Sequence, residues 1–126
     1  MEKKYLSELH SEHQVWLNAL KFYEDDIKIL KDRLGEVSVK NTANDINAIV
    51  ERFQNKLIIQ KDELDKLKHE INLHEQEIEQ NVKDNPVASD HRKLDDHSNL
   101  RDRMDTFELL INNLRKDMVL FFAKWM

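Results

Sequence analysis

The sequence predicts an all-α fold, an elongated antiparallel bundle of three helices that run up, down and up. The chain of 126 residues contains a single glycine and a single proline, and sheets depend on turns that both residue types favour. These two residues separate three long stretches that contain no other strong helix breaker. Within each stretch, apolar residues recur in steps of three and four, which is typical of a helix face buried in a bundle.

The first helix is expected over about residues 3–34. Gly35 follows it directly, and glycine most easily adopts the left-handed conformation found just beyond a helix end. We therefore place the first turn at about residues 35–40. The buried series of this helix is Leu6, Leu9, His13, Trp16, Leu20, Tyr23, Ile27, Leu30 and Leu34.

The second helix is expected over about residues 40–82, with Ser38, Asn41 and Thr42 as candidate N-caps. Its series contains a stutter near Phe53, which would locally unwind a superhelix. A break there would give a four-helix variant, although no glycine or proline is nearby. The series is Ile46, Ile49, Phe53, Leu57, Gln60, Leu64, Leu67, Ile71, His74 and Ile78.

The third helix is expected over about residues 87–124. Pro86 cannot continue a helix but suits the first turn of a new one, and Ser89 is an alternative N-cap. Its series is Met104, Phe107, Ile111, Leu114, Met118, Phe121 and Trp125. Short connections make neighbouring helices antiparallel, so residues 1–126 are expected to form one domain with coiled-coil-like packing. With Trp16 in the middle of its first helix, this outline resembles a spectrin repeat, and the resemblance implies the three-helix fold alone.

Composition and charge exclude several classes of protein. The net charge is −5 and no basic stripe is present, so a nucleic-acid partner is not expected. The absence of cysteine excludes disulfides, thiolate metal sites and thiol nucleophiles. The N-terminal residues lack the apolar core of a signal peptide, and the longest apolar run, residues 118–123, is too short to cross a bilayer. We therefore expect a cytoplasmic protein without a transmembrane segment.

Apolar residues outside the buried series gather in the half of the bundle near Gly35 and the C-terminus. Leaving such a side chain exposed forgoes about 1.5–3 kcal/mol of burial, and a cluster of them usually marks an interaction site. The sequence therefore predicts association with another protein, most simply as a homodimer, while a thicker core is the alternative interpretation. The candidate interface residues are Val15, Ala19, Phe22, Ile29, Val119, Phe122 and Met126.

The six histidines raise a ligand- or metal-binding bundle as an alternative function. His74 and His97 are weak metal candidates, because a turn at 83–87 places them at the same height on facing helices. His13 also belongs to a buried series, but the turn expected at 35–40 separates it from the height of His74 by about 15 Å. No histidine is preceded by an acid three residues earlier, so the Glu-x-x-His motif of carboxylate-bridged metal bundles is absent. We expect no bound metal and no other cofactor.

No pattern in the sequence predicts catalysis, so we expect a protein that is not an enzyme. Adjacent acids such as Asp25 and Asp26 point to different faces of a helix. The serines lack the context of a nucleophile elbow, and no glycine-rich phosphate loop is present. A further alternative is a peripheral membrane module that uses the Phe121–Met126 end, although the negative net charge disfavours contact with anionic lipid.

Overall fold

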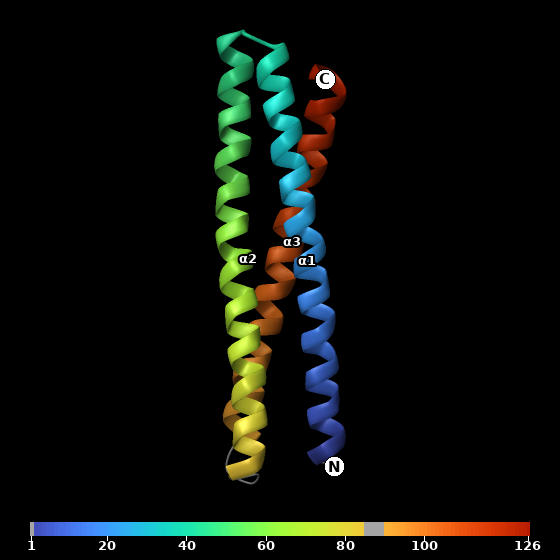
Figure 1. Ribbon diagram of the computed structural model, residues 1–126, viewed down its shortest axis with the longest axis vertical. Coiled ribbons are helices and arrows are strands. Elements are labelled where there is room, and N and C mark those ends of the chain that lie inside the picture. The colour runs from blue at the N-terminus through green and yellow to red at the C-terminus, as the bar shows by residue number, and fades with distance from the viewer. Residues whose placement is uncertain (1, 85–89) are drawn as a thin grey trace.

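The chain forms a long bundle in which two parallel helices pack against one antiparallel helix (Figure 1). A computed structural model describes the backbone of residues 2–84 and 90–126, and the side chains of residues 7–80 and 96–126. The helices are α1 (Glu2–Lys40), α2 (Asn44–Asp84) and α3 (Asp90–Trp125). The predicted all-α, up-down-up bundle is confirmed, and the described part of the chain contains no strand. No helix in this part combines the length and apolar character needed to cross a membrane.

The turn between α1 and α2 lies later in the chain than the sequence predicts. α1 continues through Gly35, which has no positive φ, because a glycine can stay in a helix at a modest entropic cost. The turn instead comprises residues 41–43. Asn41 donates hydrogen bonds of 3.0 Å to the Val37 carbonyl from both its backbone and its side-chain amide. Asn41 therefore closes the end of α1, and the prediction that Gly35 does so is wrong.

The candidate N-caps of the second helix have other roles. Ser38 lies inside α1, where its hydroxyl donates to the Asn47 side-chain oxygen at 3.2 Å. The Asn47 amide donates to the carbonyl of Ala43 at 3.1 Å, so Ala43 occupies the position that Ser38, Asn41 or Thr42 was expected to fill. The candidates for the third helix, Pro86 and Ser89, lie outside the described residues.

α2 is continuous, so the four-helix variant does not occur. The stutter is accommodated by a change in which side chains face the core. Val50 is buried, whereas Ile49, Phe53 and Gln60 are half-buried. A series that changes phase in this way lets the helix keep its geometry and present a broader face.

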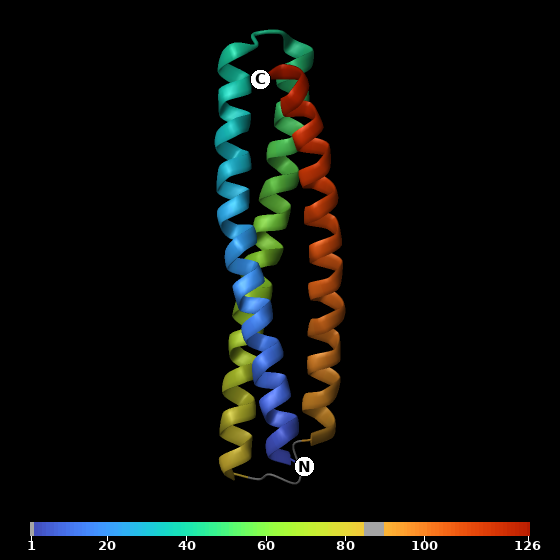
Figure 2. The ribbon, with the colours of Figure 1, turned by 90° about the vertical axis from the view of Figure 1, so that its right-hand side faces the viewer.

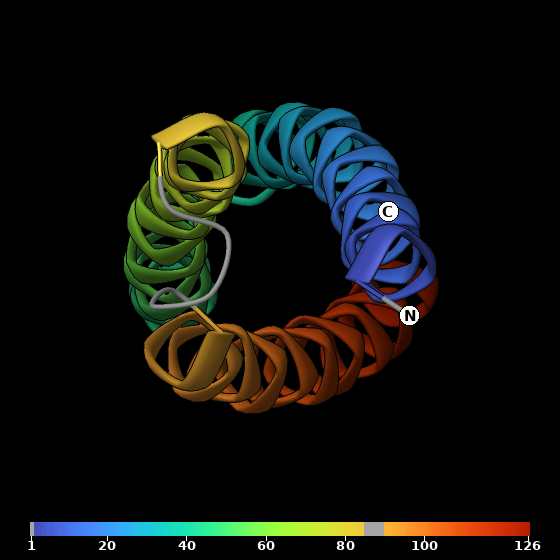
Figure 3. The same ribbon diagram turned by 90° about the horizontal axis from the view of Figure 1, so that it is seen from below.

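The core extends along the bundle and is built from the predicted series. Every described member of the first series is buried, and so is every member of the third from Met104 to Phe121. Leu64, Leu67 and Ile111 are among the side chains with no exposed surface. The view along the long axis shows the three helices surrounding a common centre (Figure 3). Each helix therefore has to supply one apolar face.

The position of the turn decides which residues lie side by side. Because α1 extends to Lys40, each of its residues faces a part of α2 further from the turn than predicted. Between the parallel helices α1 and α3, side-chain contacts join residues that are 84 to 89 positions apart. At the top of Figure 2 the C-terminus lies beside the turn, where the Asn41 amide also donates to the Trp125 carbonyl at 3.2 Å.

Candidate metal centre

Three histidines, one from each helix, meet in the core toward the N-terminal end of α1. His13, His74 and His97 have exposed fractions of 0%, 4% and 1%. The centroids of the three rings lie 5.0 to 5.7 Å apart. One nitrogen from each ring lies within 4.8 Å of the nitrogens from the other two. We call this cluster the histidine centre.

The sequence predicts correctly only one of the two height relations within the histidine centre. The prediction that His74 and His97 share a height is confirmed. The prediction that His13 and His74 differ in height by about 15 Å is wrong, because the ring centroids lie 5.1 Å apart. The error follows from the turn, which lies at residues 41–43 instead of 35–40. The signal in the sequence is that each histidine occupies a buried position of its own helix series.

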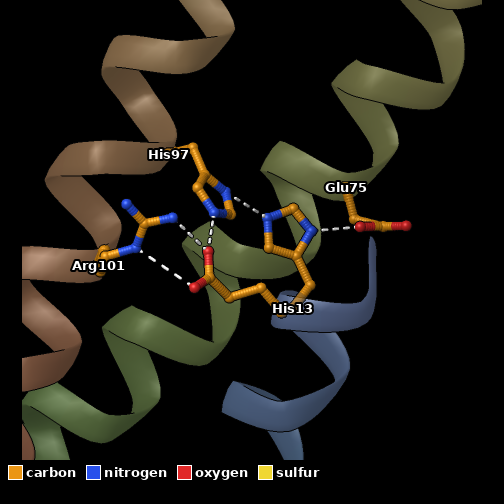
Figure 4. Close-up of polar contacts among 5 residues, drawn as sticks. His13, Glu75, His97 and Arg101 are labelled. Atoms are coloured by element: carbon orange, nitrogen blue, oxygen red, sulfur yellow. Dashed lines mark hydrogen bonds and ion pairs between the residues drawn. The ribbon is translucent and has the colours of Figure 1, made fainter. Parts of the chain in front are cut away.

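A chain of hydrogen bonds crosses the bundle through His13 and His97 (Figure 4). His13 Nδ1 donates to the Glu75 carboxylate on α2, and His13 Nε2 lies 3.1 Å from His97 Nδ1. At the other end, His97 Nε2 donates to the Glu12 carboxylate on α1. Arg101 completes the chain, because its guanidinium donates to both oxygens of Glu12, at 2.7 Å and 3.3 Å.

The two terminal carboxylates determine where the protons of these histidines lie. An ionised carboxylate can only accept hydrogen bonds, so His13 Nδ1 and His97 Nε2 each carry a hydrogen. In neutral imidazoles, the other nitrogen of each ring is then an acceptor. His13 Nε2 and His97 Nδ1 therefore direct lone pairs toward each other at 3.1 Å. Two lone pairs that face each other in this way can bind one metal ion between them.

Both carboxylates are held in the ionised state. The hydrogen bond from Arg101 is the main cause that lowers the pKa of Glu12. Burial by itself would raise the pKa of Glu75, but hydrogen bonds from His13 and His10 outweigh it and lower that pKa. The same contact raises the pKa of the exposed His10. Glu75 thus accepts hydrogen bonds from one buried and one exposed histidine.

Burial lowers the pKa of His97, and the hydrogen bond to Glu12 offsets this effect only in part. His97 is therefore a neutral imidazole near pH 7, the form that binds metal ions. Trp16 stacks on the His97 ring, with centroids 4.8 Å apart and an angle of 26° between the planes. Trp16 is itself buried, so it shields one side of the histidine centre from water.

The predicted interface residues divide into buried and exposed groups. Phe122 is buried in the core, and the half-buried Ala19 packs against this core. Both positions agree with the thicker-core interpretation. Phe121 is buried as well, so the end considered for membrane contact turns two aromatic rings inward. The other five candidates are 42% to 65% exposed, and we call them the apolar face: Val15, Phe22, Ile29, Val119 and Met126.

The apolar face spans α1 and α3. The Arg115 guanidinium of α3 lies 5.8 Å from the centre of the Phe22 ring on α1. Val119 lies one helical turn beyond Arg115, on the same side of α3. Arg115 also pairs with the buried Asp26 of α1 at 3.4 Å, which holds the two helices together beneath this surface.

Comparisons with models of known protein families, with curated proteins and with solved structures give no match.

Proposed function

We propose that the bundle binds one divalent transition-metal ion at the histidine centre, with Zn²⁺ as the ion that fits best. The ligands are His13 Nε2, His97 Nδ1 and one ring nitrogen of His74. Imidazole suits Zn²⁺, copper, iron and nickel, and Zn²⁺ readily accepts three histidines with a fourth position left for water. The observation that carries this proposal is the convergence of the two lone pairs, 3.1 Å apart.

The distances suit a tetrahedral ion after small side-chain rotations. Zn–N bonds measure about 2.0–2.1 Å, so two tetrahedral ligand nitrogens lie roughly 3.4 Å apart. His13 Nε2 and His97 Nδ1 are already close to this separation. The nitrogen of His74 lies within 4.8 Å of both, so any movement that it needs is no more than the order of 1 Å.

The residues behind the ligands support the same proposal. Metal-binding histidines commonly donate their second N–H to a carboxylate, which fixes the ring and raises the basicity of the ligand nitrogen. Glu75 has this role toward His13, and Glu12 has it toward His97. Replacing a buried polar layer by apolar side chains of similar volume is often neutral or stabilising, so holding the helices together does not require this layer. The buried imidazoles of His13 and His97, each with a carboxylate partner, are therefore better explained by binding.

The two tryptophans provide an internal test with a matched control. Trp16 stacks on His97, whereas Trp125 lies at the opposite end beside Asn41. We expect one equivalent of Co²⁺ to quench fluorescence strongly in the Trp125→Phe variant, which keeps Trp16. The Trp16→Phe variant, which keeps Trp125, should show little quenching. Visible absorption of tetrahedral Co²⁺ should saturate at the same single equivalent, and Zn²⁺ should abolish it.

Equal quenching in both tryptophan variants would contradict the proposal, because ions scattered over the acidic surface would act on both rings. Saturation only at several equivalents would contradict it in the same way. A His97→Leu variant adds a second control, because it removes one ligand and should lose the visible absorption while the helix content stays unchanged.

We propose self-association as a second candidate function, supported by the apolar face. Phe22 at 54% exposure and Val15 at 65% are large side chains that a second copy of the chain could cover, and two-fold dimers are the commonest oligomers. Light scattering should give twice the mass of the 126-residue chain, and Phe22→Asp should restore the monomer. A wild-type monomer at high concentration would refute this candidate.

A further inference from the structure

Two oppositely charged side chains of α3 border the apolar face. Arg115 pairs with the buried Asp26 of α1 through its Nε atom, and the Arg115 side chain is 45% exposed. This contact leaves both Nη groups of the guanidinium able to donate to a further carboxylate. Glu108 precedes Arg115 by seven residues, which is two helical turns, so the two side chains lie on the same side of α3.

Glu108 has an apolar neighbour where Arg115 has a charged one. The heptad repeat that places Arg115 beside Asp26 places Glu108 beside Ala19, seven residues earlier on α1. Glu108 is half-buried. Burial raises its pKa, and the negative charge of Asp105 raises that pKa further. Among the described residues, Glu108 is therefore a partly desolvated carboxylate without a cation beside it.

A two-fold axis perpendicular to the bundle would bring these two charges together from different copies of the chain. Near the middle of the bundle, side-chain contacts between α1 and α3 join residues 89 positions apart, so Phe22 is level with position 111 of α3. Position 111 lies close to the midpoint between Glu108 and Arg115. Rotation about an axis at this height exchanges the heights of the two charges, and Glu108 of one copy then stands opposite Arg115 of the other.

The same axis covers the apolar face. Val15 lies seven residues before Phe22, and Val119 lies eight residues beyond the position level with Phe22. Rotation therefore brings Val15 of one copy to Val119 of the other, and the two Phe22 rings meet near the axis. These side chains are 52% to 65% exposed in the single chain, so their contact removes apolar surface from water.

The charges distinguish this arrangement from a parallel one. A two-fold axis along the bundle would bring each residue of the face to its own copy. Glu108 would then meet Glu108, and Arg115 would meet Arg115. Like charges placed opposite each other in an interface are unfavourable and suppress that arrangement.

We infer that the apolar face binds a second copy of this chain in antiparallel orientation, with Glu108 of each copy paired to Arg115 of the other around a two-fold axis near Phe22. This inference rests on the self-association proposed above, and it specifies the orientation and the contacts that determine it. Each Glu108 gains a cation in the dimer, and the bidentate geometry of the guanidinium suits a carboxylate.

Disulfide cross-linking tests the orientation, because the chain contains no cysteine of its own. In the Val15→Cys/Val119→Cys variant, we expect oxidation to convert most of the protein to covalent dimers. Within one chain these positions differ in height by roughly 22 Å, which no disulfide spans. The controls are the single variants Val15→Cys and Val119→Cys. Each places its two cysteines about 20 Å apart in an antiparallel dimer and should stay without a cross-link.

Glu108→Gln tests the ion pair. The dimer Kd, measured by analytical ultracentrifugation, should rise about tenfold or more because two charge pairs are lost. The stability of the single chain, measured well below that Kd, should not fall, since Glu108 has no cation beside it there. The control is Glu51→Gln, which removes an exposed carboxylate of α2, outside the apolar face, and should leave the Kd within about twofold.

Three results would overturn the inference. The first is cross-linking of a single variant as efficient as that of the double variant, because identical positions meet only in a parallel dimer. The second is a wild-type dimer in which none of the cysteine variants forms a cross-link, and the third is an unchanged Kd in Glu108→Gln. A wild-type chain that stays monomeric at high concentration would instead refute self-association itself, and light scattering would show this before any variant is made.

Discussion

The two halves of the bundle hold the same three helices together in different ways. Near the Asn41 turn the core is apolar, and Leu34 and Met118 have no exposed surface. In the histidine centre, the equivalent layer consists of three imidazoles, two of which, His13 and His97, are hydrogen-bonded to carboxylates from outside the core. Apolar packing is tolerant of exchange between similar side chains, whereas a buried polar layer is stable only when its partners are in place. The first half provides cohesion, and the second contains the site that we propose to bind a metal ion.

A histidine placed in the apolar half gives the largest expected effect and tests whether the two halves really differ. Met118→His removes a fully buried apolar side chain and introduces a polar ring without a carboxylate partner built for it. We expect a loss of about 3–5 kcal/mol in the free energy of unfolding, measured by urea denaturation. If the variant were as stable as wild type, this core would tolerate a buried histidine without a carboxylate partner. The difference proposed between the two halves would then be contradicted.

The sequence explains the apolar half better than the polar one. The steps of three and four from Leu9 to Leu34 predict which side chains are buried, because burial needs only an apolar face. The height of His13 relative to His74 depends on the turn, and Gly35 suggested a helix end that the hydrogen bonds of Asn41 place six residues later. The supporting carboxylates are harder still to predict, because Glu12 and Glu75 are two of 25 acidic residues and only their positions in space distinguish them.

A smaller change tests the other half, by removing the charge of one carboxylate that supports the histidine centre. Glu75→Gln keeps the shape of the side chain but removes the charge that supports His13. We expect the affinity for Zn²⁺ to fall about 10- to 100-fold, which is typical when such a supporting carboxylate is lost. Competition with a chromophoric chelator measures this affinity.

Glu79→Gln is the matched control for this change, since Glu79 lies one turn further along α2 and is exposed. Its affinity for Zn²⁺ should stay within about twofold of wild type. Equal losses in the two variants would mean that overall charge, and not the hydrogen bond to His13, governs binding.

The smallest expected effect concerns the apolar half and the end of α1. Gly35 is exposed, lies inside the helix, and a Cβ added there would have no atom within 4 Å. Gly35→Ala should therefore raise the free energy of unfolding by about 0.4–1 kcal/mol, without altering metal affinity. Destabilisation by this substitution would indicate a left-handed residue at position 35, and with it an earlier turn that separates His13 from His74.

The coordination of bound zinc tests the central claim most directly. Zinc X-ray absorption spectroscopy on protein loaded with one equivalent should show three imidazole nitrogens at about 2.0–2.1 Å and one further oxygen or nitrogen. A shell dominated by carboxylate oxygens, or one with fewer than three imidazoles, would contradict a metal centre built from His13, His74 and His97.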